Sequence, residues 1–140
     1  MKKHLAQMQP NEIIYLRNKI NSITQFYLTE HCQERMREKK VNKKQILQTL
    51  INYSVVEYHR KGLDDRVLLR GIKRYGNDNV CALVSLCNQS VITVYRNDNR
   101  DRHSTIDWEQ YRDNLDIIDL VDNNTYKMDS NQDLEIIKII

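Results

Sequence analysis

Three histidines, His31, His59 and His103, each stand near an arginine in the sequence. This combination of side chains suits the cleavage of RNA by attack of a 2′-hydroxyl group on the adjacent phosphodiester. That reaction needs a base for the hydroxyl proton, an acid for the leaving 5′-oxygen, and cations that stabilise the charge on the phosphorane. Histidine serves the first two roles near neutral pH, and the guanidinium of arginine donates two hydrogen bonds to phosphate oxygens. The sequence therefore predicts acid–base chemistry at these histidines that requires no metal and no other cofactor.

The first histidine lies on a predicted helix, four positions before Arg35. That spacing places both side chains on one helix face, about one turn apart. Arg35 would bind a phosphate while His31 moves a proton, and Glu34 would orient the imidazole ring or accept a proton. The competing interpretation is that His31 is a surface or capping residue near the start of the helix, and this interpretation is favoured when the helix motif is taken alone.

The other two histidines lie where predicted strands end. His59 closes a strand and is placed to enter a cleft, although an exposed edge residue explains it equally well. His103 lies in a polar loop, residues 97–107, after the last strand of the predicted sheet. Loops on a rigid scaffold often carry function, but an ordinary solvated loop is the alternative.

Aromatic residues near these histidines offer surfaces for unpaired bases. Tyr58 and Tyr95 are the candidates for base stacking, with Tyr75 and Trp108 as further possibilities. Stacking on aromatic rings is the common way in which proteins bind single-stranded RNA. The alternative is that they belong to the core, and we expect this of at least half of them.

Charge is distributed unevenly along the chain of 140 residues, which has a formal net charge of +3. Basic residues gather at 35–44, at 66–74 and at 96–102, whereas residues 107–122 are acidic. A basic body with an acidic extension fits a surface that binds a polyanion, although ordinary surface charge explains the pattern about as well. Arg74, in the second basic group, is a candidate contact for RNA phosphate.

Several classes of protein are excluded by what the sequence lacks. The three cysteines have no spacing typical of a metal knuckle or a disulfide framework, which indicates a reducing compartment. No glycine-rich phosphate loop is present, and no apolar run approaches the roughly 18–20 residues of a membrane helix. We therefore expect a cytoplasmic protein without membrane association, in the cytoplasm of the host cell if a phage encodes it.

Apolar periodicity predicts helices followed by a run of strands. The helices are expected at residues 10–24, 29–39 and 42–51, with a short link at 26–28. The strands are expected at residues 55–59, 66–72, 80–86 and 91–96, with a final strand or an oligomer contact at 134–140. This order predicts an α+β fold in which N-terminal helices pack on a four-stranded, mainly antiparallel sheet.

The length of the chain predicts a single domain that spans residues 1–140. Its core is expected at about residues 10–112, where the apolar segments lie. The remaining residues, about 113–140, are expected to form an acidic C-terminal extension.

Two segments resemble known microbial families. Residues 28–39, with a His-x-x-x-Arg-x-x-x-Lys pattern, resemble the helix of DUF4258-type proteins, and residues 91–96 are similar to the closing Ile-Thr-Val-Tyr strand of that family. The same helix pair resembles the RegB-like phage endoribonucleases, which share the RelE-like toxin fold. The resemblance covers about residues 25–96 and implies a microbial ribonuclease fold of two helices packed on an antiparallel sheet.

The resemblance also implies roles for particular residues. His31 and Arg35 match the helix motif directly, and His59 falls where RegB-like proteins place a second functional histidine. Arg70 and Arg96 lie on strands that carry phosphate-binding arginines in RelE-like enzymes. RelE-like folds also occur as binding modules that have lost activity, so the resemblance leaves a role in binding open.

These observations lead to a first hypothesis of a metal-independent endoribonuclease of phage or mobile-element type, acting on single-stranded or ribosome-bound RNA. The alternative is a non-catalytic RelE-like binding protein, such as a phage inhibitor of a host nucleic-acid enzyme. The acidic extension favours this alternative, because clustered carboxylates mimic nucleic acid or meet a basic partner. A structural or regulatory accessory domain is a third possibility, for which the sequence offers no specific feature.

Overall fold

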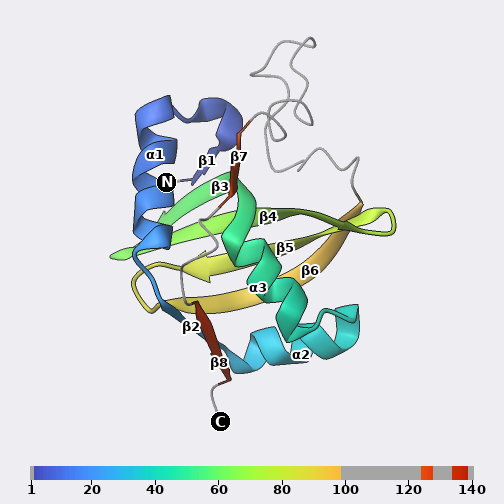
Figure 1. Cartoon of the computed structure of the whole chain (residues 1–140). Helices are drawn as coiled ribbons and strands as arrows, with labels where there is room; N and C mark the ends of the chain where they lie inside the picture. The colour runs from blue at the N-terminus through green and yellow to red at the C-terminus, as the bar shows by residue number, and fades with distance from the viewer. Residues whose placement is uncertain (1, 99–123, 128–133, 139–140) are drawn as a thin grey trace.

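The computed structural model describes residues 2–98, 124–127 and 134–138, which form three α-helices, one short 3-10 helix and eight strands (Figure 1). In chain order the elements are β1 (Lys2–His4), η1 (Leu5–Gln7), α1 (Pro10–Asn21), β2 (Gln25–Leu28), α2 (Glu30–Lys39), α3 (Lys43–Ile51), β3 (Asn52–Lys61), β4 (Asp64–Tyr75), β5 (Asp78–Ser85), β6 (Ser90–Asp98), β7 (Thr125–Lys127) and β8 (Glu135–Lys138). None of the helices in these ranges is long and apolar enough to cross a membrane.

The second and third helices begin at the caps that the sequence predicts. The hydroxyl of Thr29 accepts a hydrogen bond from the backbone N–H of Cys32 at 3.0 Å, and the side chain of Asn42 accepts one from the N–H of Gln45 at 2.8 Å. These caps satisfy N–H groups that have no partner within the helix. α2 ends at Lys39, and the next residue, Lys40, has a φ of 55° that turns the chain toward α3. Both predicted helices are confirmed, and α1 is shorter at its C-terminal end than predicted.

The eight strands join in one mixed, mainly antiparallel open sheet. Seven of them follow the order β1-β3-β4-β5-β6-β2-β8, and β7 pairs with β3 off this path. β3 to β6 form an antiparallel meander, which confirms the four predicted strands, whereas β2 pairs in parallel with both β6 and β8. The predicted α+β class is confirmed.

The prediction of only four strands is wrong because it misses the short strands at the two edges of the sheet. β1 and β7 have three residues each and β2 has four, too few for an alternating pattern to stand out. Their partners also lie far away along the chain, as in the pairing of Gln25 with Glu135. β8 confirms the strand alternative for residues 134–140, and the sheet extends past both ends of the predicted 10–112 core.

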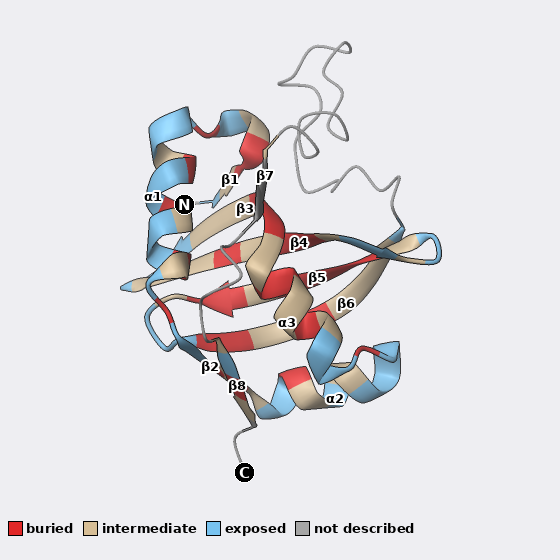
Figure 2. Cartoon of the chain, in the orientation of Figure 1, coloured by how far each residue is buried: buried red, intermediate tan, exposed pale blue. Residues whose placement is uncertain are grey.

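One hydrophobic core holds all three helices against the same face of the sheet. The helices contribute Leu16 and Ile20 from α1, Cys32 from α2, and Ile46 and Leu50 from α3. The meander contributes alternate residues, among them Val55, Val67, Leu69, Val80, Ala82, Val84, Val91 and Val94. Figure 1 shows α1 and α3 in front of the strands, and Figure 2 shows buried positions concentrated where α3 crosses them.

α3 lies very close to β4 at Gly71. A Cβ atom built at this glycine would lie 2.9 Å from the Oγ1 atom of Thr49 and 3.2 Å from the carbonyl oxygen of Val80. Thr49 is itself fixed, because its hydroxyl donates a hydrogen bond to the carbonyl of Gln45 at 2.9 Å. The absence of a side chain at residue 71 therefore sets how closely the helix layer approaches the sheet.

The opposite side of the meander, which we call the open face, carries the residues that alternate with the core positions. Tyr58 and Val67 pack against the core, so their neighbours in sequence project from the other side of the pleated strands. The open face is defined by Glu57, His59, Arg66, Leu68, Arg70, Cys81, Leu83, Thr93 and Tyr95.

Candidate functional site

Charged side chains gather around His59 on the open face. His59 is the cross-strand partner of Lys2 on β1 and of Arg66 on β4. Directly opposed residues in antiparallel strands have Cβ atoms about 4.5–5.5 Å apart. Glu57 lies two residues before His59 on the same face, and its carboxylate forms an ion pair with the Nζ atom of Lys2 at 2.9 Å. These four residues, the His59 cluster, bring an imidazole, a carboxylate and two cations together.

Arg66 is oriented by a chain of hydrogen bonds. Its Nε atom donates to Oδ2 of Asp64 at 3.1 Å, and Oδ1 of Asp64 accepts a hydrogen bond from the hydroxyl of Ser85 at 2.8 Å. The terminal nitrogens of Arg66 form no hydrogen bond within the described ranges of the chain. The guanidinium is therefore held in one orientation while its outer nitrogens stay available to a phosphate.

Arg70 lies on the open face but is only 4% exposed. Its Nη2 atom donates to Oδ1 of Asn79 at 3.1 Å, and the Nδ2 atom of Asn79 donates to the carbonyl of Gly71 at 2.9 Å. Cys81 and Tyr95 continue the same cross-strand row on β5 and β6. The predicted phosphate contact at Arg70 is thus enclosed, whereas Tyr95 is half-buried on the open face, where a stacking residue is expected.

The predicted helix site lies at another place in the fold. α2 packs against β6, with His31 and Glu34 exposed, and Nη1 of Arg35 forms an ion pair with Glu38 at 2.8 Å. β4 and β5 separate β3 from β6, which corresponds to about 14 Å at the usual spacing between strands. A general acid and base must both lie within hydrogen-bond reach of the reacting groups. The structure does not bring His31 and His59 to one such site.

Arg96 lies on the helix-covered side and contacts the end of α2. Its Nη2 and Nε atoms donate to the carbonyl of Lys40 at 3.1 and 3.4 Å, and the ring centre of Tyr75 lies 6.0 Å from its guanidinium carbon. A carbonyl at a helix C-terminus carries partial negative charge, so this contact stabilises α2. Arg74 is exposed near the β4–β5 turn. Neither arginine belongs to the His59 cluster.

Tyr58 also points away from the open face, toward α1. Its hydroxyl donates a hydrogen bond to Oδ1 of Asp65. Burial, followed by this hydrogen bond, raises the pKa of the Tyr58 phenol above its usual value. Its side chain therefore lies on the other side of β3 from His59, which separates this predicted stacking residue from the cluster.

Two further predictions fall on residues that the structure does not describe. His103, predicted as a third acid–base residue, lies outside the described residues, as does the acidic segment 107–122. Within the described ranges, no group of three or more His, Cys, Asp or Glu residues is arranged to hold a metal ion.

Three members of the His59 cluster were not predicted as site residues. A signal for Glu57 exists in the sequence, because side chains at positions 57 and 59 of a strand share one face. Arg66 is visible only as part of a basic group. Lys2 gives no signal at all, because its place depends on the pairing of β1 with β3, which is remote along the chain.

Comparison with known proteins identifies the middle of the chain. Residues 28–96 match the model of a family described as a domain of unknown function (DUF4258). This segment, from the end of β2 to β6, therefore forms a DUF4258 domain, as the resemblance of its helix and its last strand predicts. No curated protein and no solved structure matches the chain. The RelE-like fold accordingly stays a prediction.

Proposed function

We propose that this protein, whose residues 28–96 form a DUF4258 domain, is a metal-independent endoribonuclease of phage or mobile-element type. Its substrate is single-stranded or ribosome-bound RNA, and the reaction takes place on the open face rather than at α2. The observation that carries the proposal is the His59 cluster, which joins a carboxylate, an imidazole and two cations on three adjacent strands.

Two members of the cluster divide the proton transfers. The carboxylate of Glu57 takes the proton of the 2′-hydroxyl group, whose oxygen forms a bond to phosphorus. The protonated imidazole of His59 gives its proton to the 5′-oxygen as the bond between phosphorus and that oxygen breaks. The products are a 2′,3′-cyclic phosphate and a 5′-hydroxyl end, and exchange with water restores both side chains.

The two cations stabilise the charge that develops on the phosphorane. Arg66 is already oriented by Asp64, so its outer nitrogens donate to the non-bridging oxygens without reorganisation. Lys2 pairs with Glu57 in the free protein. When Glu57 becomes protonated, Lys2 loses this partner and binds the negative phosphate instead.

The residues of α2 have a different role in this proposal. His31, Glu34 and Arg35 lie at the β6 side of the domain and take no part in the proton transfers. The basic turn between α2 and α3 holds the phosphate backbone, which is the usual source of affinity for nucleic acid. The RelE-like fold is part of the same proposal, because the three described helices all pack on one face of the sheet and the substrate is proposed to bind the other.

The test is incubation of the purified protein with mixed-sequence single-stranded RNA in EDTA, with detection of 2′,3′-cyclic phosphate ends. His59→Ala and Glu57→Gln should each lower the cleavage rate by at least about 100-fold, the usual size of an acid–base contribution. His31→Ala is the matched control, a histidine outside the cluster, and should stay within about threefold of the wild type. Urea denaturation of each variant reports whether its fold is intact.

A negative result with free RNA leads to the same assay on translating ribosomes. The proposal is wrong if the wild-type protein cuts neither substrate. The placement of the site on the open face is wrong if His31→Ala loses as much activity as His59→Ala.

The burial of Arg70 favours a second candidate function, a non-catalytic RelE-like binding protein such as a phage inhibitor of a host nucleic-acid enzyme. Because Arg70 is 4% exposed and bonded to Asn79, one predicted phosphate contact is not displayed at the surface. This candidate predicts a protein or RNA partner that is captured equally by the wild type, His59→Ala and Glu57→Gln, with no cleavage by any of them.

A further inference from the structure

We propose that the groove between α3 and β8 is a docking site for an extended acidic segment of a partner protein, which adds a strand to the free edge of β8. The groove has a volume of about 520 Å³ and is lined by Lys43, Lys44, Leu47 and residues 134–137. It lies on the helix-covered side of the sheet. The proposal therefore goes beyond the ribonuclease function and does not depend on it.

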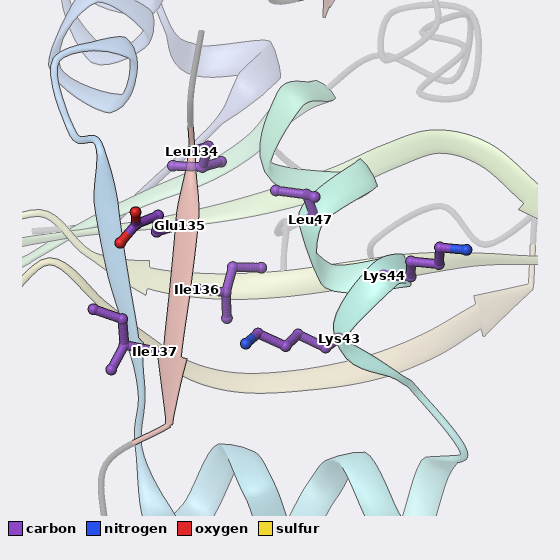
Figure 3. Close-up of a pocket in the computed structure, with 7 residues that line it drawn as sticks. All are labelled: Lys43, Lys44, Leu47, Leu134, Glu135, Ile136 and Ile137. Carbon is purple, nitrogen blue, oxygen red and sulfur yellow. The ribbon is translucent and has the colours of Figure 1, made fainter.

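The walls of the groove are aliphatic. Figure 3 shows Leu47 and Lys43 extending from α3 toward the side of β8 that carries Leu134 and Ile136. Ile136 is 6% exposed and anchors β8 in the core, whereas Leu47 and Leu134 are partly exposed at the groove. Such a surface is suited to apolar side chains that enter from outside.

The backbone of β8 offers hydrogen bonds along the same groove. On one side β8 pairs in parallel with β2 over all four of its residues, and no other described strand pairs with it. Free N–H and C=O groups on a strand edge are a ready template for another strand. Because residues 134–137 line the groove consecutively, an added strand of about four residues, about 13 Å long, fits beside them.

The charge of the groove selects an acidic partner. Lys43 and Lys44 are exposed and form no ion pair or hydrogen bond within the described ranges. Both stand in the first turn of α3, which contains no acidic residue, although the positive end of a helix dipole favours carboxylates there. Glu135 does not neutralise them, because its carboxylate contacts Gln25 at 3.3 Å and points away from α3 in Figure 3.

The same observations favour a peptide over nucleic acid. Nucleic-acid grooves combine cations with aromatic rings on which bases stack. None of the described residues that line this groove is aromatic. A strand added to the edge of β8 turns every second side chain toward Leu47 and Ile136. Figure 3 shows Lys43 extending toward β8 and Lys44 extending away from it, so a carboxylate of the peptide meets Lys43 while Lys44 adds positive charge at the rim.

Fluorescence anisotropy tests the proposal with the full-length protein and two labelled ten-residue peptides. One peptide alternates aspartate with leucine or valine, and the other has lysine in place of each aspartate. We expect the acidic peptide to bind at least about tenfold more tightly than the basic one. The double variant Lys43→Glu/Lys44→Glu should weaken its binding at least about tenfold, whereas Lys39→Glu, a control outside the groove, should change it less than about twofold.

Hydrogen exchange tests the added strand separately. Binding of the acidic peptide should protect backbone N–H groups of residues 135–138, because a strand on the edge satisfies them. The proposal is overturned if both peptides bind equally, if the double variant binds as the wild type, or if these N–H groups stay unprotected.

Related experiments test two other possible occupants of the groove, RNA and a second copy of this chain. A single-stranded RNA oligonucleotide whose binding is lost in Lys43→Glu/Lys44→Glu, in place of the peptide, overturns the proposal in favour of RNA. A dimer detected by light scattering and lost in Leu47→Asp overturns it in favour of a second copy of this chain.

Discussion

On the helix-covered face of the sheet, Val67, Leu69 and Val84 are fully buried among the side chains of the helices. On the open face, Arg66 and Leu68 alternate with Val67 and Leu69 along β4 and are partly exposed. The same strand therefore supports the core with one set of residues and presents charged groups with the other. Substitutions at neighbouring positions should accordingly affect different properties, stability on one face and function on the other.

The largest expected difference between a buried and an exposed position is in the reactivity of two cysteine thiols. Cys32 lies in the core, where burial raises the pKa of its thiol to about 12, whereas Cys87 is exposed. At pH 8 a thiol with that pKa is ionised in about one molecule in 10,000, against about one in ten for a cysteine with the ordinary pKa of 9.0. We expect iodoacetamide to label Cys87 at least about 1000-fold faster than Cys32, measured by mass spectrometry of peptides. Similar rates would show that the core opens readily.

The same thiol gives a pH dependence of stability. The folded protein keeps the proton of Cys32 to about pH 12, whereas the unfolded chain releases it near the ordinary thiol pKa of 9.0. Since the folded state then binds more protons, the stability from this group is complete below pH 9 and declines as the pH rises toward 12.

A matched pair of alanine substitutions compares the two faces directly. Leu50→Ala removes a side chain with 0% exposure from α3 and should lower the free energy of unfolding by about 3 kcal/mol. Thr93→Ala on the open face should change it by less than about 0.5 kcal/mol. Urea denaturation measures both values. Equal losses would mean that the open face is packed as tightly as the core.

The contact between α3 and β4 should respond to one added methyl group. Gly71→Ala places a Cβ atom 2.9 Å from Oγ1 of Thr49, and we expect a loss of about 1–3 kcal/mol in the free energy of unfolding. Thr49→Ala in the same chain removes that oxygen and should recover part of the loss. Additive effects in this double-mutant cycle would contradict a clash between the two side chains.

The smallest expected effect concerns the start of α1. Hydrogen bonds from Lys3 and from the backbone N–H of Gln9 lower the pKa of the Glu12 carboxyl below its ordinary value of 4.5. A lowered pKa in the folded state stabilises the protein above pH 4.5 and ceases to do so as the pH falls below it. Glu12→Gln should therefore reduce the drop in melting temperature below that pH.

Local signals in the sequence predict the helices and the central strands. Thr29 and Asn42 are strong caps, and the β-branched segments of β3 to β6 stand out between turn residues. The edge strands could not be predicted, because β1 and β2 are short and are stabilised by partners remote in sequence. Pairing of this kind depends on the whole fold rather than on local propensity.

The candidate site was predicted only in part for the same reason. His59 could be singled out from its type and its predicted place at the end of a strand, although this placement is wrong because β3 continues to Lys61. Its separation from His31 follows from the strand order, in which β4 and β5 lie between β3 and β6, and no local pattern reports that order. The ion pair of Glu57 with Lys2 likewise requires the pairing of β1 with β3.

The pairing of β8 with β2 has a consequence for folding kinetics. Gln25 and Glu135 meet across this pair although they are 110 residues apart. Closing so long a loop is slow, because the chain loses entropy before the contact forms. On the ribosome, β2 emerges long before β8 and keeps an unpaired edge until residues 135–138 arrive. Because an unpaired strand edge is a template for another chain, we expect this edge to be exposed to aggregation until β8 pairs with it.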